Sequence, residues 1–253
     1  MNRMTVVLQN DMKDIVRSRQ FLIIAIIVGL IVMGATTGIT IALRMWLDPG
    51  VAWEEAQPLL ELFVGLTVNF VPLLVLFICM ATWAIDPVAK EKARGPIESL
   101  LSTPLTGRGV WLGKSLAIFV PAYVMALVST LLVLLVMNLA AIFPATQHFV
   151  LTPPQVLTGF FLLPLLMLAV MALGILFSLI TNPVVGQTIL IFFGVVFMQV
   201  VAQLGARITW LLGSWDYALY NLAGAVLLGG IAFYLSRLLS KERIILSSKG
   251  KWA

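Results

Sequence analysis

Six long apolar runs without a charged side chain dominate this chain of 253 residues. They cover residues 21–43, 62–85, 115–140, 156–180, 184–205 and 218–236. The hydrocarbon core of a bilayer is about 30 Å thick, and a helix of about 20 apolar residues crosses it. Each run reaches about that length. We therefore predict an all-α membrane protein with six transmembrane helices, organised as a single domain over residues 1–253.

The charged residues, 16 Lys and Arg against 11 Asp and Glu, all fall outside these runs. Hydrophobic residues make up 61% of the chain, which argues against soluble enzymes, disordered regulators and disulfide-stapled domains. Residues 1–20, 86–114 and 237–253 hold 14 of the 16 basic residues, and the alternate connections hold only Arg44 and Arg207. The positive-inside rule therefore predicts that both termini are cytoplasmic. The net charge of +5 is a topology signal and does not indicate nucleic-acid binding.

Motifs for catalysis or nucleotide binding are missing from the sequence. The stretch GRGVWLGKS at 107–115 is near a phosphate-binding loop, but Arg108 stands where the loop needs a glycine. His148 and Cys79 are the only residues of their types. An acidic cluster without regular metal-ligand spacing precedes the second run, formed by Asp48, Glu54, Glu55 and Glu61. We expect a protein that is not an enzyme and holds no cofactor or metal, with a solvated acidic outer loop.

Uncharged polar residues inside the runs are the candidates for a substrate pathway. Ion-coupled carriers commonly place Asp, Glu or Arg within their spans, whereas these runs offer Asn69, Gln199 and Gln203. Gln199 and Gln203 share one helix face, where they either line a pathway or make hydrogen bonds between helices, and we favour the second. Gly34 and Gly38 form a GxxxG pattern, which predicts close helix packing or a dimer face.

The inner connection 86–114 is shorter than a compact domain of roughly 50 residues, yet it contains a helix pattern. Gly95 suits the N-cap, Pro96 suits the first helical position, and Glu98 favours the positive end of the helix. An apolar face and a stop signal follow, formed by Ile97, Leu100, Leu101 and Pro104. We predict a short amphipathic helix over about 96–103, which either lies in the headgroups or docks into a soluble partner.

A resemblance to a known family lies in residues 91–114, EKARGPIESLLSTPLTGRGVWLGK. The stretch resembles the signature of the type-2 ABC transporter permeases, in which a Glu-Lys-Glu-Arg-Gly-Thr run leads into Leu-Leu-Ser-Thr-Pro and ends in Leu-Gly-Lys. Ala93 and Pro96 stand where the family often has Glu and Thr. Residues 10–21 and 237–246 are similar to the amphipathic N-terminal helix and the basic end of such permeases. The matching positions are Glu91, Lys92, Arg94, Gly95, Glu98, Leu100, Leu101, Ser102, Thr103, Pro104, Leu105, Gly113 and Lys114.

This resemblance implies a multi-pass permease subunit of an exporter in the cytoplasmic (inner) membrane. Two permeases, identical or paralogous, would form the pathway above two separate ATP-binding subunits, which would bind ATP and magnesium. The helix over 96–103 would be the coupling helix, and the turn at 181–183 would make a smaller second contact. The residues expected at the docking surface are Glu91, Arg94, Gly95, Ile97, Glu98, Leu100, Leu101 and Pro104.

Three other functional classes share part of this pattern. A self-sufficient six-helix carrier or channel would line its bundle with polar residues. An intramembrane enzyme would have to use His148, Cys79 or the acidic loop, and an assembly factor would recruit the ATPase without transport. The absence of charge in the runs favours the ABC exporter, because ATP hydrolysis in another subunit then supplies the energy. The substrate stays open, because one fold serves many cargoes.

Overall fold

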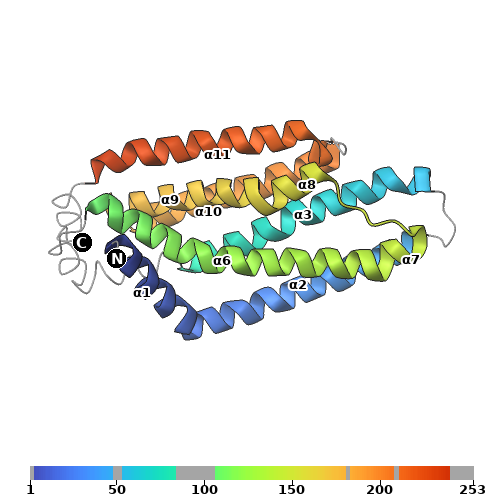
Figure 1. Cartoon of the computed structure of the whole chain (residues 1–253), viewed down its shortest axis with the longest axis horizontal. Helices are drawn as coiled ribbons and strands as arrows, with labels where there is room; N and C mark the ends of the chain where they lie inside the picture. The colour runs from blue at the N-terminus through green and yellow to red at the C-terminus, as the bar shows by residue number, and fades with distance from the viewer. Residues whose placement is uncertain (1–2, 48–52, 84–105, 181–182, 208–210, 240–253) are drawn as a thin grey trace.

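The computed structural model describes residues 3–47, 53–83, 106–180, 183–207 and 211–239. Within these ranges all regular secondary structure is helical. Six segments are long and apolar enough to cross a membrane: Arg19–Trp46, Trp53–Trp83, Gly107–Thr146, Pro153–Ile180, Val184–Gln203 and Trp215–Leu238. They lie side by side as one elongated bundle (Figure 1). The predicted all-α fold with six membrane-spanning helices is confirmed.

Short π-helices and 3-10 helices, labelled η, lie between or at the ends of the described α-helices. In chain order the described elements are α1 (Arg3–Arg17), α2 (Arg19–Trp46), α3 (Trp53–Trp83), α6 (Gly107–Met137), the π-helix η1 (Asn138–Ile142), α7 (Phe143–Thr146), α8 (Pro153–Leu157), the π-helix η2 (Thr158–Leu162), α9 (Leu163–Ile180), α10 (Pro183–Arg207), the 3-10 helix η3 (Leu211–Gly213), α11 (Trp215–Leu235) and the 3-10 helix η4 (Ser236–Leu238).

Helix α9 forms the centre of the bundle. Its sequence, LPLLMLAVMALGILFSLI, is apolar on every side, as expected of a helix that is surrounded by others. It packs against α3, α6, α10 and α11, and α3 and α6 also pack against each other. Helices α2, α10 and α11 bury much less of their surface than α3 and α9 do. Helices α2 and α11 form two outer edges of the bundle (Figure 1). Their exposed faces are aliphatic and aromatic, which suits contact with lipid.

The spanning helices are longer than the uncharged runs in the sequence. Helix α3 begins at Trp53 instead of Leu62, so it includes Glu54 and Glu55 in its first turn. Acidic side chains at this position are stabilised by the positive end of the helix. Helix α6 begins at Gly107 instead of Ser115 and includes Lys114. Glu54 and Glu55 were expected in a loop, and the structure places them in a helix. The third spanning helix was expected to contain no charge, and it contains Lys114.

The N-terminal amphipathic segment, predicted over 10–21, is divided between two helices. Helix α1 ends at Arg17, and α2 begins at Arg19, with Ser18 as its N-cap. Ser18 Oγ accepts a hydrogen bond from the Phe21 backbone N–H at 3.1 Å and donates one to the Ile15 carbonyl at 2.7 Å. These two bonds fix a sharp bend between α1 and α2, which Figure 1 shows at the lower left of the bundle.

Glycines mark the closest approaches between helices, although Gly34 and Gly38 do not. A Cβ on Gly159 would lie 2.6 Å from the backbone carbonyl oxygen of Val68, so η2 and α3 come together there. A Cβ on Gly34 or Gly38 would meet nothing within 4 Å. The close packing predicted for this GxxxG pattern is therefore not made with any described part of this chain.

A tyrosine of α6 makes a hydrogen bond to the backbone of the π-helix η2. Residue 164 is a proline, so it cannot donate the helical hydrogen bond to the Phe160 carbonyl four residues earlier. Tyr123 Oη of α6 donates to that carbonyl instead, at 2.7 Å. An unpaired carbonyl in hydrocarbon is costly, because no water is available to replace the lost partner. The Tyr123 hydroxyl therefore joins α6 to the π-helix η2.

Tyr123→Phe is expected to reduce the free energy of unfolding by about 1 kcal/mol, in the range of membrane-embedded side-chain hydrogen bonds. The substitution keeps the ring, which stacks on Phe119 at 5.4 Å between centroids. Denaturant titration of the purified protein in detergent measures the change. Tyr220→Phe is the matched control, because the Tyr220 side chain is 68% exposed. Equal effects of the two substitutions would contradict this account.

Candidate functional site

The predicted docking residues, from Glu91 to Pro104, lie outside the described residues, and so do positions 181 and 182. The structure describes what flanks the longer segment. Helix α3 ends at Trp83 before it, and α6 begins at Gly107 after it. Thr106 is the N-cap of α6, and its Oγ1 accepts a hydrogen bond from the Gly109 N–H at 3.2 Å. The last residues of the 91–114 stretch thus form the first turns of a spanning helix.

Lys114 is a buried cation in these first turns. Its Nζ lies 3.3 Å from Asp11 Oδ2 of α1, and the side chains of Lys114 and Asp11 are 4% and 30% exposed. A buried ammonium group is tolerated when it is paired and hydrogen-bonded. Gly113, the preceding residue, is also buried. The pair fastens α1 to α6 directly after the predicted docking segment.

The end of the last spanning helix meets α6 at the same level. A Cβ on Gly107 would lie 2.8 Å from the Leu239 carbonyl oxygen, so no larger residue fits there without movement. Arg108 Nε lies 3.4 Å from the Ser236 carbonyl oxygen, to which it donates, and the guanidinium lies over the Phe233 ring, 5.9 Å from its centroid. The start of α6 is therefore a junction that holds both α1 and the end of α11.

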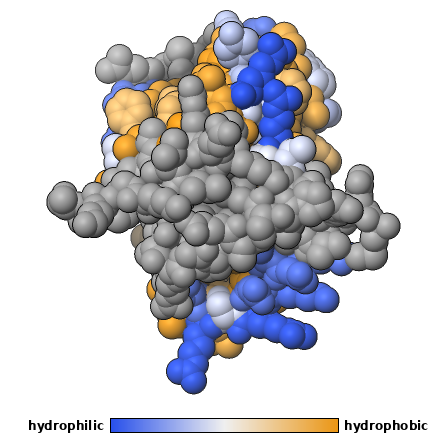
Figure 2. All heavy atoms as spheres, turned by 90° about the vertical axis from the view of Figure 1, so that its left-hand side faces the viewer, coloured by the Kyte–Doolittle hydropathy of each residue, from blue (hydrophilic) through white to orange (hydrophobic). Residues whose placement is uncertain are grey.

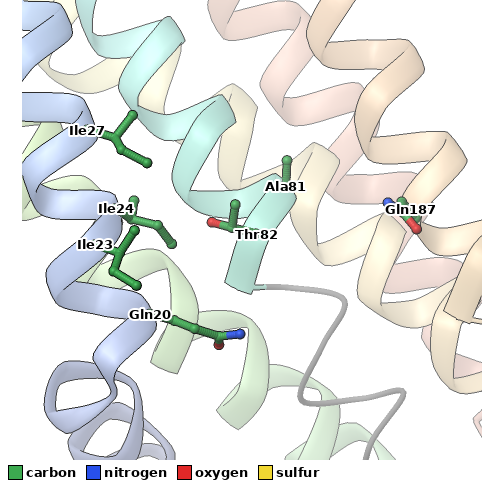
Figure 3. A pocket seen from close by; sticks show the side chains of 7 residues that line it. All are labelled: Gln20, Ile23, Ile24, Ile27, Ala81, Thr82 and Gln187. Carbon is green, nitrogen blue, oxygen red and sulfur yellow. The ribbon is translucent and has the colours of Figure 1, made fainter.

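A groove of about 480 Å³ opens between α2, α3 and α10 at this same end of the bundle. Ile23, Ile24 and Ile27 form its wall on α2, and three uncharged polar side chains face it (Figure 3). These are Gln20 near the start of α2, Thr82 near the end of α3 and Gln187 near the start of α10. The groove offers aliphatic contacts along one side and amide and hydroxyl groups at its other positions.

The polar residues chosen from the sequence are not brought together at this groove. Asn69 is fully buried in α3, and its Nδ2 donates to the Gly65 carbonyl at 2.7 Å. Gln199 and Gln203 lie on the exposed face of α10. Neither glutamine makes a hydrogen bond to another described helix, so the favoured interhelical bond is absent from this part of the chain. Their place in a pathway stays a prediction.

Sequence reasoning missed Gln20, Thr82 and Gln187 because it considers each helix separately and cannot show which residues of different helices become neighbours. Each is an ordinary polar residue near a helix end, and only the packing of three helices makes them neighbours. The buried pairing of Lys114 with Asp11 was missed for a different reason. A search for uncharged runs ends each run at the first charge, so Lys114 was placed in the connection before the run 115–140. The one signal for its partner was that Asp11 is an acidic residue on the amphipathic N-terminal segment.

His148 has a packing role in the structure. Its ring stacks on Trp53, with 4.4 Å between the centroids, and its Nδ1 lies 2.6 Å from the Thr146 carbonyl oxygen. Among the described residues no three His, Cys, Asp or Glu side chains gather as a metal site would require. Cys79 is buried in the apolar core. These residues are therefore explained by local structure.

Comparison with known families decides the assignment of this bundle. The model of a family described as ABC-2 family transporter protein matches residues 5–213. The chain belongs to the ABC-2 transporter family. No curated protein and no solved structure matches it. The ABC-2 match runs from the first turn of α1 to the end of η3 and so includes the Lys114–Asp11 pair and all described residues that line the groove.

The family assignment confirms the resemblance seen in residues 91–114. The chain is a multi-pass membrane permease of an ABC transporter. Members of the ABC-2 family are in general membrane components without catalytic activity of their own, and an ATP-binding partner is general to the family. The groove and the α6 junction are therefore parts of a transport protein.

Proposed function

We propose that this permease is the membrane subunit of an ABC exporter, which forms the substrate pathway and is driven by a separate ATP-binding subunit. The family match over 5–213 is the observation that carries the proposal. The partner subunit would bind ATP and magnesium, and the permease itself would hold no cofactor. The basic residues of 1–20, 86–114 and 237–253 favour a cytoplasmic (inner) membrane location with both termini inside.

Docking would occur through the helix predicted over 96–103. Ile97, Leu100 and Leu101 would fill an apolar groove on the ATP-binding subunit, and Glu98 would pair with a basic side chain there. This segment precedes α6 directly, and α6 packs against α1, α2, α3 and α9. A displacement of the docking helix would thus reach most of the bundle through one spanning helix.

The groove between α2, α3 and α10 is our proposed access to the pathway from the cytoplasmic side. None of its described lining residues is charged, so it would accept apolar or uncharged polar parts of a substrate. Asn69, Gln199 and Gln203 would then act further along, with the exposed α10 glutamines facing a second permease copy or paralogue. ATP binding can shift the two states of the pathway only if the docking contacts differ between them.

The experiment is purification of the tagged full-length chain from its own host with any bound ATP-binding subunit, followed by a magnesium-dependent ATPase assay. Leu100→Asp is expected to reduce recovery of the ATPase subunit about tenfold or more, because a carboxylate would have to enter an apolar contact. Glu98→Ala is expected to reduce it less. Glu54→Ala is the matched control, because Glu54 is exposed at the opposite end of α3.

Two results would overturn the proposal. One is full recovery of ATPase activity with the Leu100→Asp protein. The other is substrate flux into liposomes by the purified chain alone, driven by an ion gradient, which would instead support a self-sufficient carrier or channel. Loss of recovery with Glu54→Ala to the same extent as with Glu98→Ala would show a general loss of folding and would remove the support for a docking helix.

A further inference from the structure

The bend between α1 and α2 holds a second groove, which shares Ile23 with the groove between α2, α3 and α10 but is bordered by charged side chains. It has a volume of about 610 Å³ and is lined by residues between Val16 and Ala25. Two arginines, Arg17 and Arg19, border it on either side of Ser18. The hydrogen bonds of Ser18 to Ile15 and Phe21 hold the bend in place, so the groove is a fixed feature of the fold.

The two arginines provide an unbalanced positive charge at this groove. Both side chains are exposed, and neither forms an ion pair within the described part of the chain. Asp14 is one turn before Arg17 on α1, yet it is not paired with it. The positive end of the α2 dipole points to the same place, since α2 begins at Arg19. Figure 2 looks onto this end of the molecule and shows hydrophilic side chains projecting at the bottom, the height of the bend in Figure 1.

The rest of the groove is apolar and exposed. Val16, Leu22 and Ile23 are 47%, 61% and 54% exposed, although they are aliphatic. Leu22 and Ile23 begin the apolar face of the first spanning helix, so the arginines stand at the level where hydrocarbon gives way to headgroups. Guanidinium groups bind phosphate oxygens in pairs of hydrogen bonds. A ligand that matches both parts has a phosphate group and an acyl chain.

We propose that the α1–α2 bend is a binding site for an anionic phospholipid of the cytoplasmic leaflet. Arg17 and Arg19 hold its headgroup, and its acyl chain lies along Val16, Leu22 and Ile23. The site adjoins the groove between α2, α3 and α10 and the end of α3 that precedes the predicted docking segment. Ile23 also lines the groove between α2, α3 and α10. Phe21 stacks on Trp83, the last described residue of α3, with 5.4 Å between the rings. The inference rests on the cytoplasmic orientation of the termini proposed above, but it does not depend on transport.

Native mass spectrometry of the full-length chain in detergent, titrated with phosphatidylglycerol or phosphatidylcholine, tests the site. The wild-type chain is expected to retain phosphatidylglycerol preferentially. Arg17→Gln and Arg19→Gln are each expected to weaken its binding about fivefold, and the double substitution about 30-fold, from the typical attraction of one basic side chain to an anionic surface. Leu22→Asn is expected to weaken phosphatidylglycerol binding as well, because the acyl chain loses an apolar contact.

Arg237→Gln is the matched control, because Arg237 is an exposed arginine at the same end of the bundle. It is expected to leave phosphatidylglycerol binding unchanged. An unchanged lipid preference in the double variant would overturn the proposal, and so would an equal loss with Arg237→Gln, which would indicate attraction to net charge alone. Competition by inorganic phosphate with no effect of Leu22→Asn would identify a soluble anion site instead. Circular dichroism of each variant verifies that the helices remain folded. If the double variant does not fold, the two single variants test the proposal.

Discussion

Asp11→Asn is expected to lower the free energy of unfolding of this permease by about 2 kcal/mol, because it leaves the Lys114 ammonium buried without its carboxylate. The nearest distance across the pair is 3.3 Å, and only 4% of the Lys114 side chain is exposed. Removal of one partner from a fully buried pair costs about 3–5 kcal/mol. We expect less here because the Asp11 side chain is 30% exposed and Lys114 has a further contact.

Two further substitutions separate charge from packing in this experiment. Asp14→Asn removes an exposed carboxylate from the same helix and is expected to change stability by less than about 0.5 kcal/mol. Lys114→Met removes the buried charge itself, so it is expected to cost less than Asp11→Asn. Denaturant titration in detergent measures all three proteins. Identical behaviour of Asp11→Asn and Asp14→Asn would show that the ion pair does not hold α1 against α6.

The number and type of the spanning helices were predictable from the sequence because the bilayer imposes a simple rule. A helix that faces hydrocarbon must be apolar over about 20 residues, and six runs satisfied this. The same rule misplaced the helix ends. Lys114 lies inside α6 and is buried against Asp11, so it need not contact lipid at all. An uncharged run marks the part of a helix that lies at the depth of the hydrocarbon, whereas the ends of the helix depend on packing.

Only the part of the candidate site that lies within one continuous sequence motif was predictable. The 91–114 stretch led to the family, which the match over 5–213 confirmed. The groove could not be found in this way, since Gln20, Thr82 and Gln187 come from three helices far apart in the sequence. Amide side chains within spans, such as Gln199 and Gln203, proved to be exposed on α10. Residue type alone does not distinguish a lipid face, a helix interface and a pathway.

Gly186 sets the distance between α10, which borders the groove, and the central helix α9. It lies in α10, and a Cβ at this position would overlap the Ser178 hydroxyl and the backbone carbonyl oxygen of Gly174, both in α9. A hydroxyl group can rotate away, but a helical carbonyl cannot. Gln187, the next residue, lines the groove between α2, α3 and α10. The position of this glutamine therefore depends on the absence of a side chain at Gly186.

Gly186→Ala is expected to lower the free energy of unfolding by about 3 kcal/mol, at the upper end of the usual cost of overpacking, because α10 must move away from α9. Gly230→Ala is the matched control, since a Cβ on Gly230 in α11 would meet nothing within 4 Å. That control is expected to be neutral or to stabilise the protein by up to about 1 kcal/mol, because alanine favours the helix. Both values come from denaturant titration in detergent. Equal stability of the two variants would mean that α9 and α10 are not in the contact described, and the position assigned to Gln187 at the groove would lose its support.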